Sequence, residues 1–386
     1  NQQLAARAIA EAREALAPVH TIADQTGRRL ISIGHNPGGV DRSVTWTDIE
    51  TNQGDWQRLF DWTIQPPSFR TNLSPAEAVH RGRILASGVE AIAETIFSGG
   101  RRDLESLKIG FATFNRARAG VTDPLLIQAA DSCIRVLGKR RRINTHRSSQ
   151  ANPDLPRYVR EFLEAIAARH GRSPPDFVRD VTNVLSRSGA FDQGILILNE
   201  LFLKSAGPQY FQCSRCARVH LHASGDTCTN CYSQLGLPLT MGVDDAGETG
   251  DYYQWLATEA GPVFRLNCAE MTGQTNKADA RTRQRLFQNI PVPPERGLTD
   301  NIDLLSVTTT MEAGVDIGSL LAVMMANMPP MRFNYQQRVG RAGRRGAAVS
   351  VALTLCRGRS HDDYYFQRPE RITADPPPPP YVDTNR

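Results

Sequence analysis

Arginine and glycine residues alternate between Gln337 and Gly346 at a spacing suited to binding phosphate. Arg341 and Arg344 are three residues apart, so on a helix they would share one face. The planar, permanently charged guanidinium group matches the oxygens of a phosphate. Glycine inside a helix costs roughly 1 kcal/mol relative to alanine, so the repeated glycines indicate a close approach to another group. A basic surface helix would not need them, and the spacing therefore predicts a phosphate-binding segment.

Four cysteines form two C-x-x-C pairs separated by eleven residues. Two such pairs can place four thiolates tetrahedrally around one zinc ion, at Zn–S distances of about 2.3 Å. His220 and His222 could replace a cysteine, but four thiolates already complete the coordination sphere and leave no position for a catalytic water. The pattern predicts a structural Zn²⁺ site in a small ribbon, in preference to unligated cysteines or a redox-active pair. The predicted ligands are Cys213, Cys216, Cys228 and Cys231.

These residues need a scaffold, and the pattern predicts an α/β lobe around the arginines. Residues 251–357 alternate between helical and strand patterns, which is typical of a parallel sheet. Upstream, residues 74–77 have the cap, proline and glutamate of a helix start, and residues 157–170 carry an apolar stripe at helical spacing. We expect a helix at 2–17 followed by a mixed, unassigned segment to residue 70, and a mostly helical region at 71–205. The zinc module at 206–240, the α/β lobe at 241–357 and a proline-rich extended tail at 358–386 follow.

The overall composition permits a nucleic-acid partner without requiring one. The chain has 45 Lys and Arg against 40 Asp and Glu, a formal net charge of +5, and a pI near 8.9. No apolar run is long enough to span a membrane, so no membrane partner is expected. Paired cysteines suit a reducing cytoplasm. Because the sequence begins at Asn1 without a methionine or a signal-peptide pattern, we expect it to be an excerpt of a longer protein.

Two further clusters of charged residues leave alternatives open. The run from Lys139 to Arg142 follows an apolar helix pattern and either contacts phosphates or ends the helix in solvent, where cations favour the helix dipole. His361, Asp362 and Asp363 could form a metal or acid–base group, but they follow the α/β lobe, and we favour a structural role.

The segment from Gln337 to Arg344 resembles the last signature motif of superfamily 2 helicases, Q-R-x-G-R-x-G-R, at all six fixed positions. Residues 304–317 resemble the preceding motif, a strand followed by T-x-x-x-x-x-G-x-D. Residues 270–275, followed by Arg281, Arg283 and Phe287, look like the strand, loop and helix that open the second motor lobe. The three pieces occur in the family order over residues 263–357, and the resemblance implies a RecA-like fold for this lobe.

The resemblance also implies roles for individual residues. Arg341 and Arg344 would be the fingers that reach the γ-phosphate of ATP, and Gln337 would sense the nucleotide. An arginine beside the transferring phosphoryl group stabilises charge that grows in the transition state. The residues expected to contact ATP from this lobe are Gly314, Asp316, Arg338 and Gly340. The residues expected to contact nucleic acid are Thr308, Thr272 and Gly273.

One half of an ATP site is missing from the sequence. There is no G-x-x-x-x-G-K-[ST] loop and no Asp-Glu-x-His strand end, the parts that hold the triphosphate and Mg²⁺. The motif that normally occupies the first strand of the second lobe is also not evident. We therefore expect ATP and Mg²⁺ to bind together with a first RecA-like lobe outside this chain, and this chain to be inactive by itself.

A finer resemblance comes from the four-cysteine module ahead of the lobe, the Glu270–Thr275 stretch and residues 359–366. Together they resemble large bacterial superfamily 2 helicases that often carry a C-terminal domain of unknown function, several of them found in phage-defence systems. This implies an ATP-dependent helicase or translocase on DNA, with partner proteins of a defence system. The alternative is a non-catalytic nucleic-acid-binding or scaffold module built on a degenerate lobe.

Overall fold

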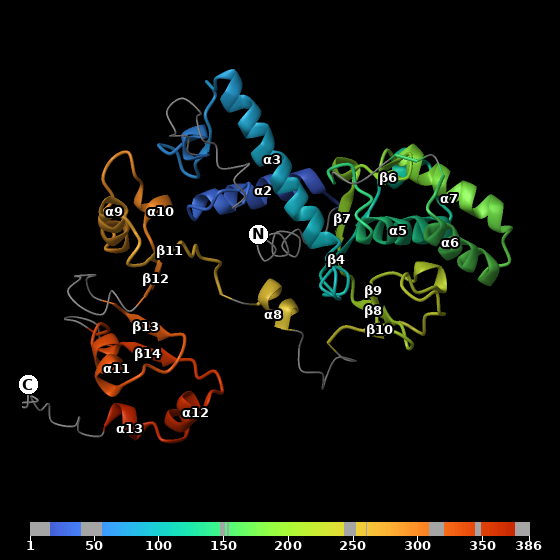
Figure 1. Ribbon diagram of the computed structural model, residues 1–386. Helices are drawn as coiled ribbons and strands as arrows, with labels where there is room; N and C mark the ends of the chain where they lie inside the picture. The colour runs from blue at the N-terminus through green and yellow to red at the C-terminus, as the bar shows by residue number, and fades with distance from the viewer. Residues whose placement is uncertain are drawn as a thin grey trace, which may run out of the picture. The chain divides into compact units, whose positions relative to one another are not determined.

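The computed structural model describes residues 16–39, 56–146, 151–152, 154–242, 252–259, 261–308, 320–343 and 349–374. The chain divides into two compact units, residues 1–264 and 265–386 (Figure 1). The predicted boundaries at residues 70, 205, 240 and 357 stay predictions. Within the described ranges, no helix is long and apolar enough to cross a membrane.

The first unit is built mainly from helices, and local sequence signals fix where they begin. The serine at position 74 caps α3 (Pro75–Ile96): its hydroxyl accepts a hydrogen bond from the Glu77 backbone, and the Glu77 carboxylate accepts one from the Ser74 backbone at 2.8 Å. This reciprocal pair confirms the predicted helix start. The other helices are α2 (Val19–Ser32), α4 (Arg116–Ala119), α5 (Pro124–Lys139), α6 (Arg157–Arg169), α7 (Pro174–Ser188) and α8 (Tyr252–Thr258).

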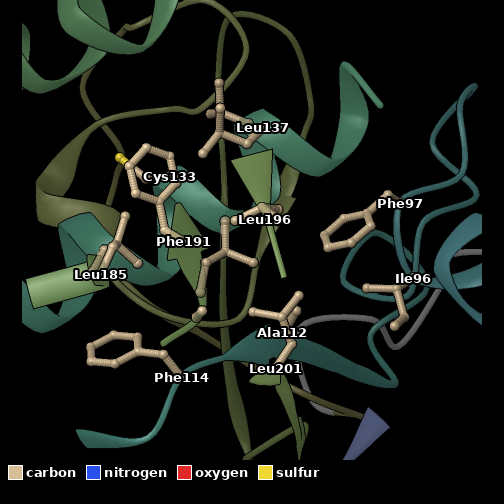
Figure 2. Packing of buried hydrophobic residues seen from close by; sticks show 14 of the residues in the cluster. Ile96, Phe97, Ala112, Phe114, Cys133, Leu137, Leu185, Phe191, Leu196 and Leu201 are labelled. Carbon is tan, nitrogen blue, oxygen red and sulfur yellow. The ribbon is translucent and has the colours of Figure 1, made fainter. Parts of the chain in front are cut away.

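The main core of this unit surrounds α5. Residues 129–138 of α5 are buried almost without interruption, and α6 turns the predicted apolar stripe toward the same core. Figure 2 shows Cys133 and Leu137 of α5 among apolar side chains of α3, α7 and the neighbouring strands. Gly138 lies so close to the Phe97 ring that an added Cβ would be 2.3 Å away. A side chain at position 138 would therefore displace that ring.

Short antiparallel strands complete the first unit. One sheet has the order β1 (Ala17–Pro18), β7 (Phe202–Ser205), β4 (Gly110–Thr113). A second has the order β10 (Leu239–Thr240), β8 (Gln209–Gln212), β9 (Val219–His220), and the first cysteine pair lies between β8 and β9. Two small hairpins pair β2 (Phe60–Asp61) with β3 (Ser68–Phe69) and β5 (Phe191–Asp192) with β6 (Ile195–Leu196). Short 3-10 helices lie at Trp56–Leu59, Leu198–Glu200 and Ser224–Asp226.

The second unit contains the parallel strands that the sequence pattern predicted. β11 (Cys268–Met271) pairs with β12 (Leu304–Val307), with α9 (Lys277–Phe287) and α10 (Gly297–Asp300) between them in the chain. β13 (Ala322–Met325) pairs with β14 (Val351–Thr354), with α11 (Arg332–Val339) between them. Each pair has the strand–helix–strand order of an α/β fold, and this confirms the predicted fold class at that level.

The end of the chain differs from the expected extended tail. Residues 360–374 contain two helices, α12 (Ser360–Gln367) and α13 (Glu370–Thr373). These helices are tied back to the lobe: a nitrogen of His361 lies 3.0 Å from the Pro329 carbonyl oxygen, and Arg332 donates to the Thr373 carbonyl at 3.4 Å. The expectation of an extended segment was therefore wrong for these residues. The proline run at 376–380 and the helix predicted over residues 2–17, apart from its last two positions, lie outside the described residues.

Candidate functional site

The arginine segment lies at the end of α11. Gln337 and Arg338 occupy the last turn of this helix, and Gly340 is its C-cap. The backbone N–H of Arg341 donates to the Arg338 carbonyl at 3.1 Å, which continues the turn by one residue. Gln337 is exposed, whereas Arg338 and Arg341 are half-buried. The structure thus presents four of the predicted nucleotide-contacting residues together at one helix end.

Beyond the end of α11 at Val339, the chain changes direction at Gly343. This residue has φ +80°, and its N–H donates to the Leu320 carbonyl at 3.0 Å. An added Cβ would lie 2.7 Å from the Ser350 hydroxyl, so glycine serves both the left-handed backbone and the close approach. The expectation that Arg341 and Arg344 share a helical face was wrong in its premise, because α11 ends at Val339.

The arginine segment is anchored beside the start of β13. Ala342 and Leu320 form an isolated parallel bridge, and the Val351 N–H donates to the Leu321 carbonyl at 3.0 Å. Arg341 therefore enters this strand–helix–strand unit at the edge where β13 and β14 begin. Arg344, Gly314 and Asp316 lie outside the described residues.

The residues predicted to contact nucleic acid lie where strands β11 and β12 end, whereas the arginine segment lies where β13 and β14 begin. Met271 and Val307 are register partners at the ends of the parallel strands β11 and β12. Thr272 and Thr308 follow these partners directly, so the structure brings the two threonines to the same edge of the pair. Sequence reasoning named both residues separately, and their shared edge follows from the parallel register.

A tight turn shapes the loop after β11. The Thr272 N–H donates to the Thr275 hydroxyl at 2.9 Å, and the Thr275 N–H donates to the Thr272 carbonyl at 3.1 Å. Asn276 then caps α9 by accepting from the Asp279 N–H at 2.8 Å. The Arg283 guanidinium donates to the Glu270 carbonyl and ties α9 back to β11. Gly273 lies within this turn. Because glycine has no side chain, the backbone is open to close approach by another group at this position.

The four cysteines converge in the first unit. Their sulfur atoms all lie within 4.8 Å of one another. The Sγ atoms of Cys213 and Cys231 are 3.6 Å apart, and those of Cys216 and Cys228 are 3.5 Å apart. A tetrahedral site with Zn–S bonds of about 2.3 Å has sulfur–sulfur edges of about 3.8 Å, close to both distances. All four cysteines are free of disulfides. The donor set therefore fits a single metal ion, and zinc is the ion that we propose.

Each C-x-x-C pair forms a tight turn, here called a knuckle, and the two knuckles have the same backbone hydrogen bond. In the first, the Ala217 N–H donates to the Cys213 carbonyl at 2.7 Å; in the second, the Tyr232 N–H donates to the Cys228 carbonyl at 3.0 Å. Ala217 and Tyr232 each follow the last cysteine of a knuckle, and both have positive φ, +53° and +58°. The first knuckle is the turn between β8 and β9, and the second is closed by the antiparallel bridge of residues 227 and 234.

Hydrogen bonding prepares one of these thiols for a metal. Burial acts to raise the pKa of Cys231, but hydrogen bonds with Ser233, Cys213 and Cys216 together outweigh burial and lower this pKa to about 6. A thiolate is the form that binds zinc. His220 and His222 lie outside the cluster of four sulfur donors. Burial lowers the pKa of both, that of His222 to about 4, so both are neutral at pH 7.

A buried ionic network connects the cysteine module to α5, and sequence reasoning missed it. Arg135 of α5 is 2.6 Å from the Asp103 carboxylate and 3.1 Å from that of Glu105. The same guanidinium donates to the Val219 carbonyl of β9 at 2.7 Å. Burial favours neutral Asp103, but Arg135 and Lys139 outweigh burial and hold the pKa of this carboxyl below its usual range.

The same contacts settle the role of the basic run after α5. Lys139 lies 3.0 Å from Asp103, the Arg140 guanidinium lies over the Tyr158 ring at 5.2 Å, and Arg142 donates to the Gly194 carbonyl at 3.1 Å. These contacts favour a structural role over phosphate binding. Asp362 is also structural, because its buried carboxylate accepts from the Arg357 N–H at 2.8 Å.

Comparison with known families finds a match that begins near the end of the first unit and covers much of the second. Residues 248–346 match the helicase conserved C-terminal domain. This part of the chain therefore matches a helicase C-terminal domain, and it includes α8, β11 to β13, α11 and the described arginine segment.

Individual relatives agree with this class. A stretch of 84 residues, 22% of the chain, is 62% identical to Druantia protein DruE of Escherichia coli (strain UMEA 4076-1). A stretch of 72 residues, 19% of the chain, is 36% identical to the ATP-dependent helicase HRQ1 of Saccharomyces cerevisiae (strain ATCC 204508 / S288c). The matched stretches span 5% and 7% of these relatives' own lengths. No solved structure matches the chain significantly.

Proposed function

We propose that the protein containing this chain is an ATP-dependent DNA helicase or translocase, and that this chain supplies its second motor lobe. The observation that carries the proposal is the arginine segment at the end of α11, inside a helicase C-terminal domain. Arg341 and Arg344 act as the arginine fingers, and Gln337, Arg338 and Gly340 line the nucleotide from the same segment. Gly314 and Asp316 contact the ribose side.

The chemistry divides between this lobe and a first lobe outside the chain. Mg²⁺, bound by that first lobe, would supply positive charge to the phosphates of ATP. The Arg341 guanidinium donates to the γ-phosphate oxygens as negative charge develops on them. Thr272, Gly273 and Thr308 bind the nucleic-acid backbone at the edge where β11 and β12 end. Movement between the two lobes on ATP turnover then shifts these backbone contacts along the strand.

Kinetics of the full-length protein test the arginine assignment. Arg341→Ala should lower kcat for ATP by about 10²-fold or more, because arginine fingers contribute about 10³–10⁵. Arg341→Lys should not restore kcat, because a point charge lacks the bidentate fork. Arg359→Ala is the matched control: it removes an exposed arginine of the same unit that precedes α12, and turnover should remain unchanged. Near-normal kcat for Arg341→Ala would instead favour a non-catalytic scaffold.

We further propose that the protein works in the bacterial cytoplasm in anti-phage defence, together with partner proteins of the same system. The support is the resemblance of the four-cysteine module and lobe to large bacterial helicases of that kind, together with the stretch shared with Druantia protein DruE. A plaque assay in a bacterium carrying the full gene cluster tests this. Equal phage titres with wild-type and Arg341→Ala protein would contradict it.

A further inference from the structure

The short helix α8 carries an unusual aromatic face in the first unit. Tyr252 and Trp255 are 62% and 47% exposed, although they are large and mostly apolar. Their rings stack, with centroids 6.2 Å apart and an interplanar angle of 25°. Tyr253 packs edge-on against Tyr252 at 5.5 Å. The aromatic groups therefore form one surface, rather than separate exposed side chains.

This helix is fixed to the first unit by its other side. Ala257 is buried in the main core of that unit. The Arg102 guanidinium lies 4.1 Å from the Tyr253 ring centroid, within the range of a cation–π contact. The aromatic surface is thus held in place from the opposite side of α8, and Arg102 adds positive charge at its border (α8 in Figure 1).

A line of arginines continues from this border to the cysteine module. Arg101, next to Arg102, donates to the Cys216 carbonyl at 3.0 Å. Arg215 precedes Cys216 in the knuckle and is exposed, as are Arg101 and Arg102. The adjacent residues Arg102 and Arg101 thus contact α8 and the first knuckle, respectively.

We propose that this surface, made of Tyr252, Tyr253 and Trp255 with Arg101 and Arg102, binds single-stranded nucleic acid by base stacking. Exposed rings offer stacking partners to unpaired bases, and neighbouring arginines attract the phosphates. A protein segment would gain from the rings but would not need the arginines beside them. Duplex DNA hides its base faces, so the surface selects the single strand. The inference rests on the proposed function, because a translocating motor holds a separated strand.

Fluorescence anisotropy with the 386-residue chain and a labelled oligothymidylate, without ATP, tests the proposal. The Tyr252→Ala/Trp255→Ala variant should weaken binding about fivefold or more, the effect of losing one stacked base. Phe366→Ala is the matched control, because it removes an exposed aromatic ring of the second unit, and its affinity should equal that of the unaltered chain. Duplex binding should be the same in all three proteins. Equal single-strand affinity for the unaltered chain and the double variant would overturn the proposal.

A second measurement avoids substitutions and their effects on folding. An oligothymidylate carrying 5-iodouracil, irradiated in complex with the unaltered chain, should crosslink to the peptide that contains Tyr252–Trp255. Crosslinks confined to other peptides would overturn the proposal. Because no ATP is present, either result is independent of the motor assignment, which depends on turnover in the Arg341→Ala protein.

Discussion

The guanidinium of Arg135 lies 2.6 Å from the carboxylate of Asp103, and both side chains are almost completely buried. This pair joins α5 to the loop after α3, and the Arg135 contact with the Val219 carbonyl extends it to β9 of the cysteine module. Buried ionic and hydrogen-bonding contacts of Arg135, in addition to apolar packing, therefore attach the candidate metal site to the main core.

Removing Arg135 should destabilise the protein strongly. Arg135→Ala leaves Asp103 and Glu105 buried without their main cation, and breaking a buried pair in this way costs about 3–5 kcal/mol. Arg157→Ala is the control: Arg157 pairs with Glu161 at 2.7 Å, but its side chain is 86% exposed, and its loss should change stability little. Urea unfolding followed by circular dichroism measures both. Equal midpoints for the two variants would contradict a structural role for the network.

The cysteine module should bind one zinc ion per chain. Cys228→Ser should abolish stoichiometric zinc, because a hydroxyl is a poor substitute for the fourth thiolate. Cys133→Ser, in contrast, alters a buried cysteine of α5 that lies outside the cluster, and it should retain the metal. Elemental analysis of protein purified without chelator compares them. Metal binding and folding of the module should be coupled, so a strong chelator should loosen residues 209–240 first in hydrogen exchange.

The parts of the fold and of the candidate sites that could be predicted from the sequence are those whose interacting residues lie close together along the chain. The cysteines were predictable because two local spacings define the site, and the lobe was predictable because its motifs are contiguous. The network around Arg135 was not, since it joins residues 29 to 116 positions apart. Nothing in a single sequence marks Glu105 as the acceptor of the Leu221 N–H.

The end of α11 shows a different limit. Helical spacing placed Arg341 and Arg344 on one face, but the Gly343 contact with Leu320 ends that geometry. A local pattern could not reveal this, because the contact comes from a residue on the other side of β13. The aromatic face of α8 was also missed, although Tyr252, Tyr253 and Trp255 stand close together in the sequence, and this local cluster of aromatic residues was the available signal.

Stability should fall as the pH drops below the ordinary histidine range. Burial lowers the pKa of His222 to about 4, against about 6.5 in an unfolded chain. Between these values the unfolded chain binds the proton and the folded chain does not, so stability declines as pH falls from about 6.5 to 4. Glu105, whose pKa burial raises, acts in the opposite direction. His222→Asn should therefore show a smaller loss between pH 7 and 5 than the unaltered chain, measured by urea midpoints.

Alanine at position 343 should lower ATP turnover because its Cβ would crowd a neighbouring side chain, in addition to straining the backbone. Gly343 and Gly358 both have positive φ, +80° and +71°, so alanine strains the backbone at either position. Only at Gly343 would the new Cβ meet another group, the Ser350 hydroxyl at 2.7 Å, whereas nothing lies within 4 Å at Gly358. Gly343→Ala should displace the arginine segment from β13 and lower ATP turnover in the full-length protein by about tenfold or more, since small misplacements at a reacting centre are costly. Gly358→Ala should leave turnover close to normal. Equal turnover in the two variants would show that the bend after Arg341 does not position the catalytic arginines.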